Sequence, residues 1–488
     1  MINKPGIIHR TVDNYCYPLN EDEVVVNLLT GYEVKAVKII WGDPFSWGIL
    51  GGDHQWMGKE EDIAFTYELP HHIQWHTTIK PKDKRLKYYF ELKSDTETLY
   101  FFENGLFEEH EINKKKVTQA CFTFPWLNPI DVFKVPKWVH QTIWYQIFPE
   151  RFANGDTNLN PHHVKEWKKG TVKNEDFYGG DLIGIINKLD YLNELGITGI
   201  YLTPIFESTS SHKYNTNDYF KIDKNFGTEE DLKRLVTRAH ELNIKIMLDL
   251  VFNHCGESFP QWLDVKANGS SSKYYDWFFM LENNNYHKFA YAENMPKLNT
   301  NNSEVQDYLV AVTKYWKAKT NIDGVRIDVA NEISLDFNRK FRKEIKSLDP
   351  EFFILGEIWH DAINWLRGDQ FDSVMNYPLT KELDQFFGSS DITVSRFKRE
   401  INQIFFNYPI QVNDVLFNLL DSHDTNRIIS RIQNADVVLQ MFLLMFALPG
   451  TPCIFYGTEI LLKGKHDPDC RRCMPWDDIE SGKHQEIT

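Results

Sequence analysis

The feature that most constrains the fold is a regular alternation, beginning after Val139, of short apolar runs with longer amphipathic stretches. Eight of the apolar runs are rich in β-branched or aromatic residues and are typical of strands: 142–148, 197–203, 244–252, 322–329, 352–358, 371–375, 415–420 and 453–456. Strands that alternate with helices form a parallel sheet wrapped by helices. Eight such units predict a (β/α)8 barrel, that is, a TIM barrel of the α/β class.

Residues that favour helix starts follow several of these strands. Asp181, Thr228 and Ser303 each precede an amphipathic run and are predicted as helix caps. The stretch 253–302, after the third strand, is far longer than an ordinary barrel loop. We therefore expect an inserted subdomain there, over the mouth of the barrel.

The first part of the chain has a different pattern. Residues 1–125 contain short alternating runs separated by turn residues, which predict an N-terminal immunoglobulin-like β-sandwich. Residues 126–140 contain two prolines and are predicted as a linker, and 141–488 as the barrel. The sequence stops soon after the eighth strand, so we expect a barrel that is incomplete at its eighth helix.

Composition excludes some classes of function. The 488-residue chain has a net charge of −15 and no basic cluster, which argues against nucleic acid as a partner. No segment is long and apolar enough for a membrane span. The N-terminus lacks a signal pattern and the six cysteines are scattered, which favours a cytoplasmic location. Cys470 and Cys473 have redox-pair or half-zinc-site spacing, but no partner pair accompanies them.

Charged residues interrupt the predicted strand at 322–329. Arg326 and Asp328 lie inside an apolar run that should be buried on both faces, either as a structural ion pair or as part of a site. Similar residues close three other runs: Asp249 with His254, Glu357, and His423 with Asp424. Because the carboxyl ends of barrel strands converge on one opening, this recurrence favours a site for acid–base chemistry on a neutral substrate.

Five motifs carry a resemblance to a known family: DLVFNH at 249–254, MPKLN at 295–299, GVRIDVANE at 324–332, LGEIW at 355–359 and LDSHD at 420–424. Together and in this order they resemble the α-amylase family of glycoside hydrolases, and within it the neopullulanase, cyclomaltodextrinase and maltogenic amylase branch. The resemblance implies retaining hydrolysis, in which Asp328 is the nucleophile, Glu357 the general acid and base, and Asp424 the carboxylate that stabilises the transition state.

The resemblance also implies a set of substrate-binding residues: His212, Tyr214, Asp249, His254, Arg326, Asn331, Glu332, Trp359 and His423. Tyr214 would stack under the sugar at the point of cleavage, and Asn331 with Glu332 resembles the branch that accepts α-1,4 and α-1,6 linkages. Trp359 would lie on the acceptor side and favour transfer to sugar, with ordinary packing as the alternative. The expected substrates are cyclodextrins, pullulan and maltooligosaccharides, with no organic cofactor.

A loop rich in oxygen-bearing side chains resembles the family's first calcium site. Its candidate ligands are Asn154, Asp156, Asn160, Gly179 and Asp181, which suit a hard cation. Leu159 stands where relatives commonly have Asn, so a solvated turn is the alternative.

The resemblance leads to two further expectations. The family's N-terminal sandwich, which is starch-binding-like, often pairs subunits, so a homodimer is expected. The relatives' C-terminal β domain is missing, as in a truncated chain, and Thr458 replaces a common Asp. Two alternatives to the hydrolase of cyclodextrins therefore stay open: an inactive glucan-binding remnant and an α-glucosidase of short oligosaccharides.

Overall fold

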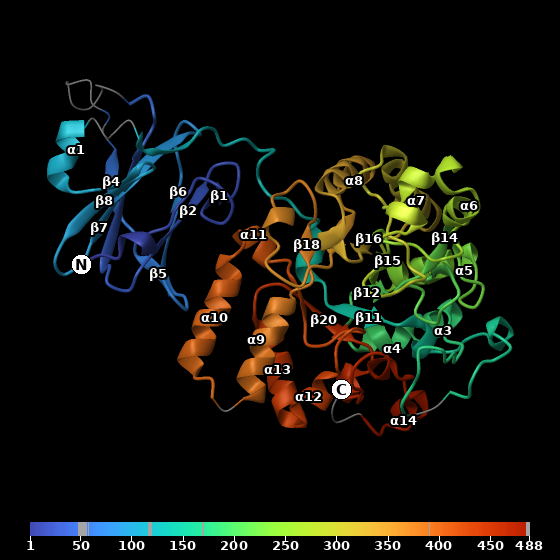
Figure 1. Ribbon diagram of the computed structural model, residues 1–488. Coiled ribbons are helices and arrows are strands. Elements are labelled where there is room, and N and C mark those ends of the chain that lie inside the picture. Colours follow the sequence, from blue (N-terminus) through green and yellow to red (C-terminus); the bar gives the residue numbers. More distant parts are fainter. Residues whose placement is uncertain (47–55, 57, 116–119, 168–169, 390, 485–488) are drawn as a thin grey trace. The chain divides into compact units, whose positions relative to one another are not determined.

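The computed structural model describes residues 1–488 apart from 47–55, 57, 116–119, 168–169, 390 and 485–488. The chain forms two compact units (Figure 1). The first contains 1–134 together with 390–413, and the second contains 135–389 together with 414–488. The membership of 390–413 in the first unit is a grouping that the sequence pattern does not reveal.

Antiparallel sheets form the first unit. One has the strand order β1 (Cys16–Pro18), β2 (Val24–Thr30), β6 (Ile73–Ile79), β5 (Phe65–Glu68). The other has the order β4 (Lys59–Asp62), β3 (Ala36–Gly42), β7 (Leu86–Lys93), β8 (Thr98–Phe102), β9 (Gly105–Phe107), with β10 (Phe122–Phe124) paired to β7. Inward-facing residues of both sheets, such as Val26 and Phe90, share one buried core. The predicted sandwich is confirmed.

Three helices belong to the same unit: α1 (Glu109–Lys115), α10 (Val394–Phe406) and α11 (Ile410–Asn413). The buried residues Phe397, Ile401 and Ile404 of α10 recur at helical spacing. At the end of α10, Phe406 completes a small apolar cluster with residues from the sandwich: Tyr15, Leu29 and Leu69. Through Phe406, the end of α10 therefore contributes to the apolar packing of this unit.

The second unit is built on eight parallel strands: β11 (Trp144–Ile147), β12 (Gly199–Leu202), β15 (Lys245–Leu250), β16 (Gly324–Ile327), β17 (Phe353–Gly356), β18 (Ser373–Val374), β19 (Phe417–Leu419) and β20 (Thr451–Phe455). Their order is β18-β17-β16-β15-β12-β11-β20-β19. A parallel bridge from Met375 to Phe417 joins the two outer strands. This closes the sheet, so the predicted barrel is confirmed.

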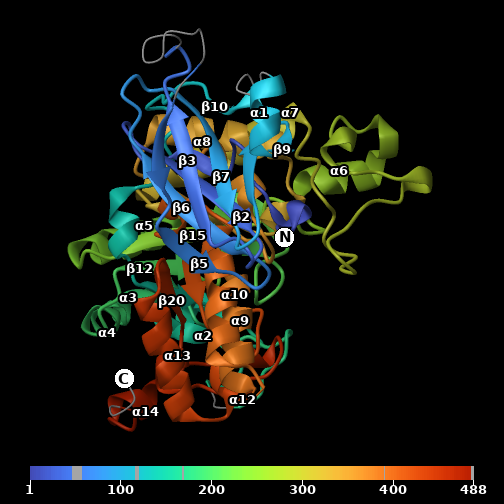
Figure 2. The same ribbon diagram turned by 90° about the vertical axis from the view of Figure 1, so that its left-hand side faces the viewer.

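Helices pack around this barrel (Figure 2): α3 (Leu182–Asn187), α4 (Leu189–Glu194), α5 (Glu229–Glu241), α7 (Ser303–Thr320), α8 (Leu335–Leu348), α9 (Tyr377–Gly388), α12 (Ile428–Ile432) and α13 (Ala435–Ala447). Asp181 and Thr228 cap α3 and α5 as predicted. The predicted cap Ser303 is wrong by one residue, because the Asn302 side chain accepts the first free amides of α7.

The stretch 253–302 forms the predicted insertion after β15. It contains α6 (Pro260–Asn268), several 3₁₀ turns and isolated bridges that include His254 to Lys297. Trp262 packs edge-on against Phe278, with ring centroids 4.8 Å apart, and provides a small core. The insertion therefore folds on its own apolar residues beside the strand ends.

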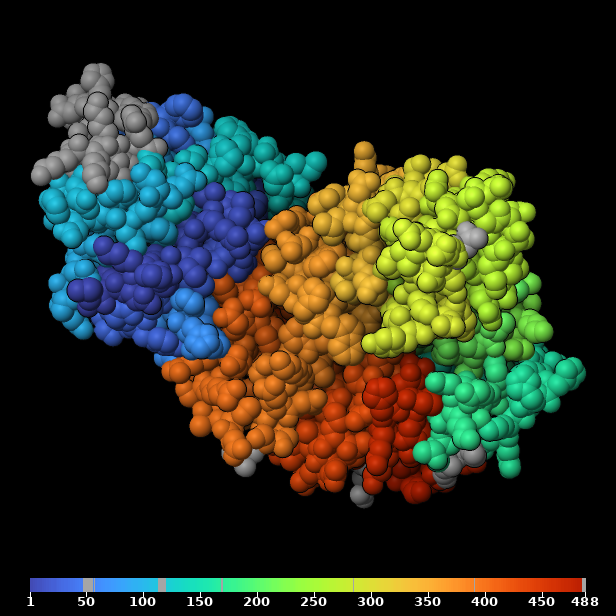
Figure 3. All heavy atoms as spheres, viewed as in Figure 1, coloured from blue at the N-terminus to red at the C-terminus, as the bar shows by residue number. Residues whose placement is uncertain are grey.

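After β20 the described chain contains short helices, of which α14 (Trp476–Glu480) is the last. This segment lies against the residues that follow β11 and α2 (Pro149–Phe152), as the adjoining red and teal surfaces in Figure 3 show. The Met474 amide donates to the Arg151 carbonyl at 2.9 Å, and the Trp167 indole donates to the Met474 carbonyl at 2.9 Å.

Within the described residues, no helix combines the length and apolarity needed to cross a membrane.

Candidate active site

Strand register brings the first charged residues together. Asp249 on β15 lies directly beside Arg326 on β16 in the parallel ladder, so both side chains point to the same side of the sheet. Asp328 follows the end of β16 and Glu357 follows the end of β17. The predicted convergence of these residues at the carboxyl ends of the strands is what the geometry shows.

Arg326 is the centre of the resulting cluster and is fully buried. Its Nη1 donates to both carboxylate oxygens of Asp249 at 2.9 Å and to Asp328 Oδ1 at 2.6 Å. Its Nη2 lies 2.8 Å from Glu357 Oε2. One guanidinium therefore serves three buried carboxyl groups.

A single cation does not compensate three carboxylates. Burial, opposed by Arg326, raises the pKa of Asp249 to about 6. Burial likewise raises the pKa of Asp328 well above its usual range, with Arg326 opposing the rise and Glu357 adding to it. Burial thus outweighs the single guanidinium at both aspartates.

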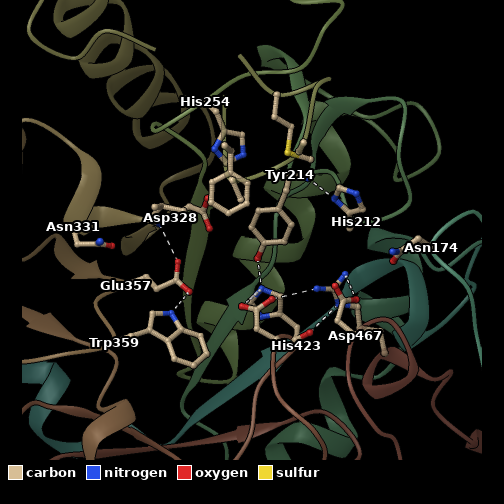
Figure 4. Close-up of a pocket in the computed structure, with 17 residues that line it drawn as sticks. Asn174, His212, Tyr214, His254, Asp328, Asn331, Glu357, Trp359, His423 and Asp467 are labelled. Atoms are coloured by element: carbon tan, nitrogen blue, oxygen red, sulfur yellow. Dashed lines mark hydrogen bonds and ion pairs between the residues drawn. The ribbon is translucent and has the colours of Figure 1, made fainter. Parts of the chain in front are cut away.

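The two oxygens of Glu357 have further hydrogen bonds. Its Oε2 accepts from the backbone amide of Val329 at 2.9 Å, and its Oε1 accepts from the Trp359 indole at 3.1 Å. The Trp359 ring stacks on Tyr377, with centroids 3.6 Å apart and planes 5° apart. Figure 4 shows Glu357 between Asp328 and Trp359.

His423 and Tyr214 lie across the pocket (Figure 4), and together with Asp424 they form a second group. The Gln146 amide lies 2.6 Å from His423 Nδ1, so the neutral ring carries its proton on Nε2. That nitrogen contacts the Tyr214 hydroxyl and lies 3.1 Å from Asp424 Oδ2. Tyr214 also donates to Asp249 at 3.0 Å, which links the two groups.

The three histidines at the pocket are neutral near pH 7. Burial lowers the pKa of His212 to about 3 and that of His254 to about 3. Burial and the nearby Arg471 lower the pKa of His423 well below its usual value. They are therefore suited to hydrogen bonding with uncharged hydroxyl groups rather than to binding anions.

These residues line a pocket of about 420 Å³: Asn174, His212, Tyr214, His254, Phe289, Ala290, Ala292, Met295, Asp328, Val329, Asn331, Glu357, Trp359, His423, Asp424, Asp467 and Arg471. Of the predicted site residues, Asp249 and Arg326 are buried behind this lining. Glu332 is not part of it either; its carboxylate pairs with Lys297, which also donates to Asn253 at 2.8 Å.

Arg471 and Asp467 line the pocket but were not predicted. Arg471 lies 3.2 Å from Asp424 Oδ1 and 2.8 Å from Asp467 Oδ1, and its Nε donates to the His423 carbonyl at 2.9 Å. The spacing of Cys470 and Cys473 was interpreted, but Arg471, which lies between them in the sequence, was overlooked. Neither thiol is part of a disulfide, and both are buried.

The candidate calcium ligands do come together, away from this pocket. Asn154 Nδ2 donates to Asn160 Oδ1 at 3.0 Å, and Gly179 packs so closely that a Cβ there would lie 2.1 Å from that oxygen. Asp181 accepts from the amides of Gly155 and Asp156.

Two observations test whether these residues fit a cation. Asn154 Oδ1 is buried without a hydrogen-bond partner, and an amide oxygen left unsatisfied in this way suits a hard cation. Within the described residues, however, no group of three or more His, Cys, Asp or Glu side chains could hold a metal. Only a site built mainly on amide and carbonyl oxygens fits.

Comparison with known proteins adds independent findings. Residues 146–486 match the family described as alpha amylase, catalytic domain, and residues 1–128 match the alpha amylase N-terminal ig-like domain. The chain is 45% identical to a cyclomaltodextrinase of Geobacillus thermopakistaniensis, over 99% of this chain and 82% of that protein. It is 40% identical to neopullulanase 2 of Thermoactinomyces vulgaris, over 98% and 82%. A solved cyclomaltodextrinase superposes with a TM-score of 0.90 at 39% identity, covering 99% of this chain and 82% of that one.

Proposed function

Because this chain belongs to the α-amylase family of glycoside hydrolases, we propose that the pocket at its barrel mouth cleaves α-glucosidic bonds in cyclodextrins, pullulan and maltooligosaccharides. The observation that carries the proposal is the cluster in which Asp249, Asp328 and Glu357 share Arg326. A neutral sugar fits a pocket whose histidines are uncharged.

In the proposed reaction, Asp328 attacks the anomeric carbon while Glu357 protonates the glycosidic oxygen. Water, activated by the ionised Glu357, then releases the sugar from Asp328 with net retention. Retaining glycosidases hold these two carboxyl groups about 5 Å apart, a separation that suits two carboxylates bound to one guanidinium. Asp424, held by Arg471 and His423, supplies negative charge near the oxocarbenium-like transition state.

The decisive experiment traps the covalent intermediate. The Glu357→Gln variant is given α-maltosyl fluoride, whose leaving group needs no protonation, and the protein is digested and analysed by mass spectrometry. We expect a maltosyl group on the peptide that contains Asp328. No adduct on that peptide, with β-cyclodextrin hydrolysis retained by Asp328→Asn, would refute the assignment.

The linkage specificity is part of the same proposal. Asn331 lines the pocket, and Glu332 beside it is held by Lys297 at the insertion, which supports acceptance of α-1,6 as well as α-1,4 bonds. Trp359, partly exposed at the pocket, is suited to receive an acceptor sugar for transglycosylation. Product analysis on pullulan distinguishes the alternatives, because panose is expected here and glucose alone would indicate an α-glucosidase.

We also propose a calcium ion in the loop of Asn154, Asn160 and Gly179, supported by the orphaned Asn154 Oδ1. Such an ion would add no chemistry to the reaction and would hold the loop between β11 and α3. Calorimetric titration of metal-stripped protein should detect binding in the wild type and not in Asn154→Ala. No heat from the wild type would refute the proposal.

A homodimer and a cytoplasmic location complete the proposal. The N-terminal ig-like domain supports the former. A relative named intracellular maltogenic amylase from Bacillus subtilis, 43% identical over 96% of this chain and 79% of that protein, supports the latter. Sedimentation at micromolar concentration should give twice the chain mass.

A further inference from the structure

The two carboxylate oxygens of Glu357 have donors of different kinds. Oε2 accepts from the Val329 amide at 2.9 Å and lies 2.8 Å from Arg326 Nη2. Oε1 accepts from the Trp359 indole at 3.1 Å. A carboxylic acid carries its proton on one oxygen at a time, so the donors decide which oxygen can exchange it.

The hydrogen-bond donor and the cation that contact Oε2 are both fixed in place. Val329 has φ 46° and ψ 44°, a left-handed conformation that is a true outlier for a β-branched residue. This conformation directs its amide at Oε2, directly after the proposed nucleophile Asp328. Arg326 is fully buried and held by Asp249. Oε2 is therefore locked as an acceptor.

The donor to Oε1 is exposed and replaceable. Trp359 is 48% exposed and lines the pocket, while one face of its ring rests on buried Tyr377. A sugar oxygen that enters the pocket can take the place of the indole N–H at Oε1 while the ring stays stacked on Tyr377. Oε1 thus faces a residue of the pocket lining, as Figure 4 shows.

We propose that Oε1 is the oxygen through which Glu357 exchanges its proton, and that the Trp359 indole occupies it until a sugar chain displaces the N–H. This inference rests on the proposed function. In the first step the Oε1 proton passes to the glycosidic oxygen as its bond to C1 breaks and Asp328 bonds to C1. In the second step Oε1 takes a proton from water as the water oxygen bonds to C1 and Asp328 leaves as a carboxylate.

Trp359 is then a positioning residue. In the empty enzyme its N–H stabilises the ionised form of Glu357, which is the base of the second step. Substrate that displaces the N–H also removes this stabilisation and so favours the protonated form that the first step needs. Entry of the sugar is thereby coupled to the protonated form of Glu357 that the first step needs.

The test compares Trp359→Phe with the wild type across pH, with β-cyclodextrin as substrate. Phenylalanine keeps a ring on Tyr377 but donates no hydrogen bond. The kcat/KM profile reports the free enzyme and the kcat profile the substrate complex. We expect the basic limb of kcat/KM to move up by about half a pH unit, giving roughly threefold higher values there, with the kcat limb unmoved.

Two further variants make the outcome clear. Trp365→Phe is the matched control in the same loop, because its buried Nε1 has no hydrogen-bond partner, and it should leave both profiles unchanged. A change of KM in Trp359→Phe without movement of the limb would overturn the inference. Glu357→Gln should abolish the basic limb; if it instead kept activity, the proposed function would fail, whatever Trp359 does.

Discussion

Asp372 and Asp323 are buried at the amino ends of barrel strands, and each has several donor partners, including positively charged side chains. The buried carboxylates at the carboxyl ends share a single cation. Before β18, Asp372 lies 2.7 Å from Arg342 Nη1 and 2.8 Å from Lys346 Nζ, and it accepts from the Ile354 amide. At the opposite end, Asp328 shares the single Arg326 with two other carboxyl groups.

The pKa values follow this difference. Burial alone would raise the pKa of Asp323, which precedes β16, but the hydrogen bonds from His240, the Ile246 amide and Lys245 lower it. At the mouth of the barrel, the effect of burial is larger than that of Arg326, and the pKa of Asp249 rises to about 6. Buried charge is thus fully paired where it only supports the barrel and left underpaired where the proposed chemistry takes place.

The largest expected effect comes from removing charge at the mouth. Asp328→Asn should lower kcat/KM on β-cyclodextrin by more than about 10³-fold, since the covalent step is lost. Its melting temperature should stay or rise, because one of three crowded carboxylates is gone. Reducing-sugar assays and thermal melts check both, and a clear loss of stability would contradict the comparison.

The same change at the amino ends should have the opposite result. Asp372→Asn leaves Arg342 and Lys346 without their buried partner and should cost about 3 kcal/mol of unfolding free energy. Specific activity of the folded protein should stay within about twofold. Urea unfolding followed by circular dichroism measures the loss, and an unchanged midpoint would refute it.

A pH series sharpens the contrast. The folded pKa of Asp249 lies above its unfolded value, so its contribution to stability is lost as pH rises from about 4 to 6. The stability of Asp249→Asn relative to wild type should therefore increase from pH 4 to 7, by at most about 3 kcal/mol.

Asp323→Asn serves as the control for that series. The folded pKa of Asp323 is lowered, so its contribution is present throughout pH 4–7 and is lost only in stronger acid. Its stability difference from wild type should stay constant over this range. If the stability difference from wild type changed with pH in the same way for both variants, the assignment of a raised pKa to Asp249 would be contradicted.

The smallest expected effect concerns orientation of Asp424. Arg471→Lys keeps the charge but loses the planar fork that joins Asp424, Asp467 and the His423 carbonyl, and should lower kcat/KM about fivefold. The neighbouring Arg472→Lys is the matched control, because Arg472 pairs with Asp469 outside the pocket. If both changes lowered kcat/KM equally, the effect would come from the loop rather than from the planar guanidinium of Arg471.

Local patterns explain what could be predicted from the sequence. Apolar runs that end in a carboxylate identify both the strands and their carboxyl ends, because in a parallel barrel these ends meet. Asp328 and Glu357 were found in this way. The cap of α7 was misplaced by one residue because Asn302 and Ser303 are both good N-caps and the sequence contains no preference between them.

Other features depend on contacts that no local pattern encodes. Arg471 ends a short 3₁₀ helix (Asp469–Arg471) after the last strand, and only tertiary packing brings it to Asp424. The amphipathic pattern of α10 predicts a helix with one buried face, but not that the helix is grouped with the first unit. The left-handed conformation of Val329 goes against the preference of its residue type.

The assignment of α10 to the first unit has a consequence for biosynthesis. Residue 390 leaves the ribosome roughly 13 to 50 s after residue 134, at 5–20 residues per second. During that interval the nascent sandwich lacks Phe406, and Leu29 and Leu69 lack a neighbour that buries them in the finished protein. The N-terminal module therefore buries Leu29 and Leu69 as in the finished protein only after most of the barrel has been translated.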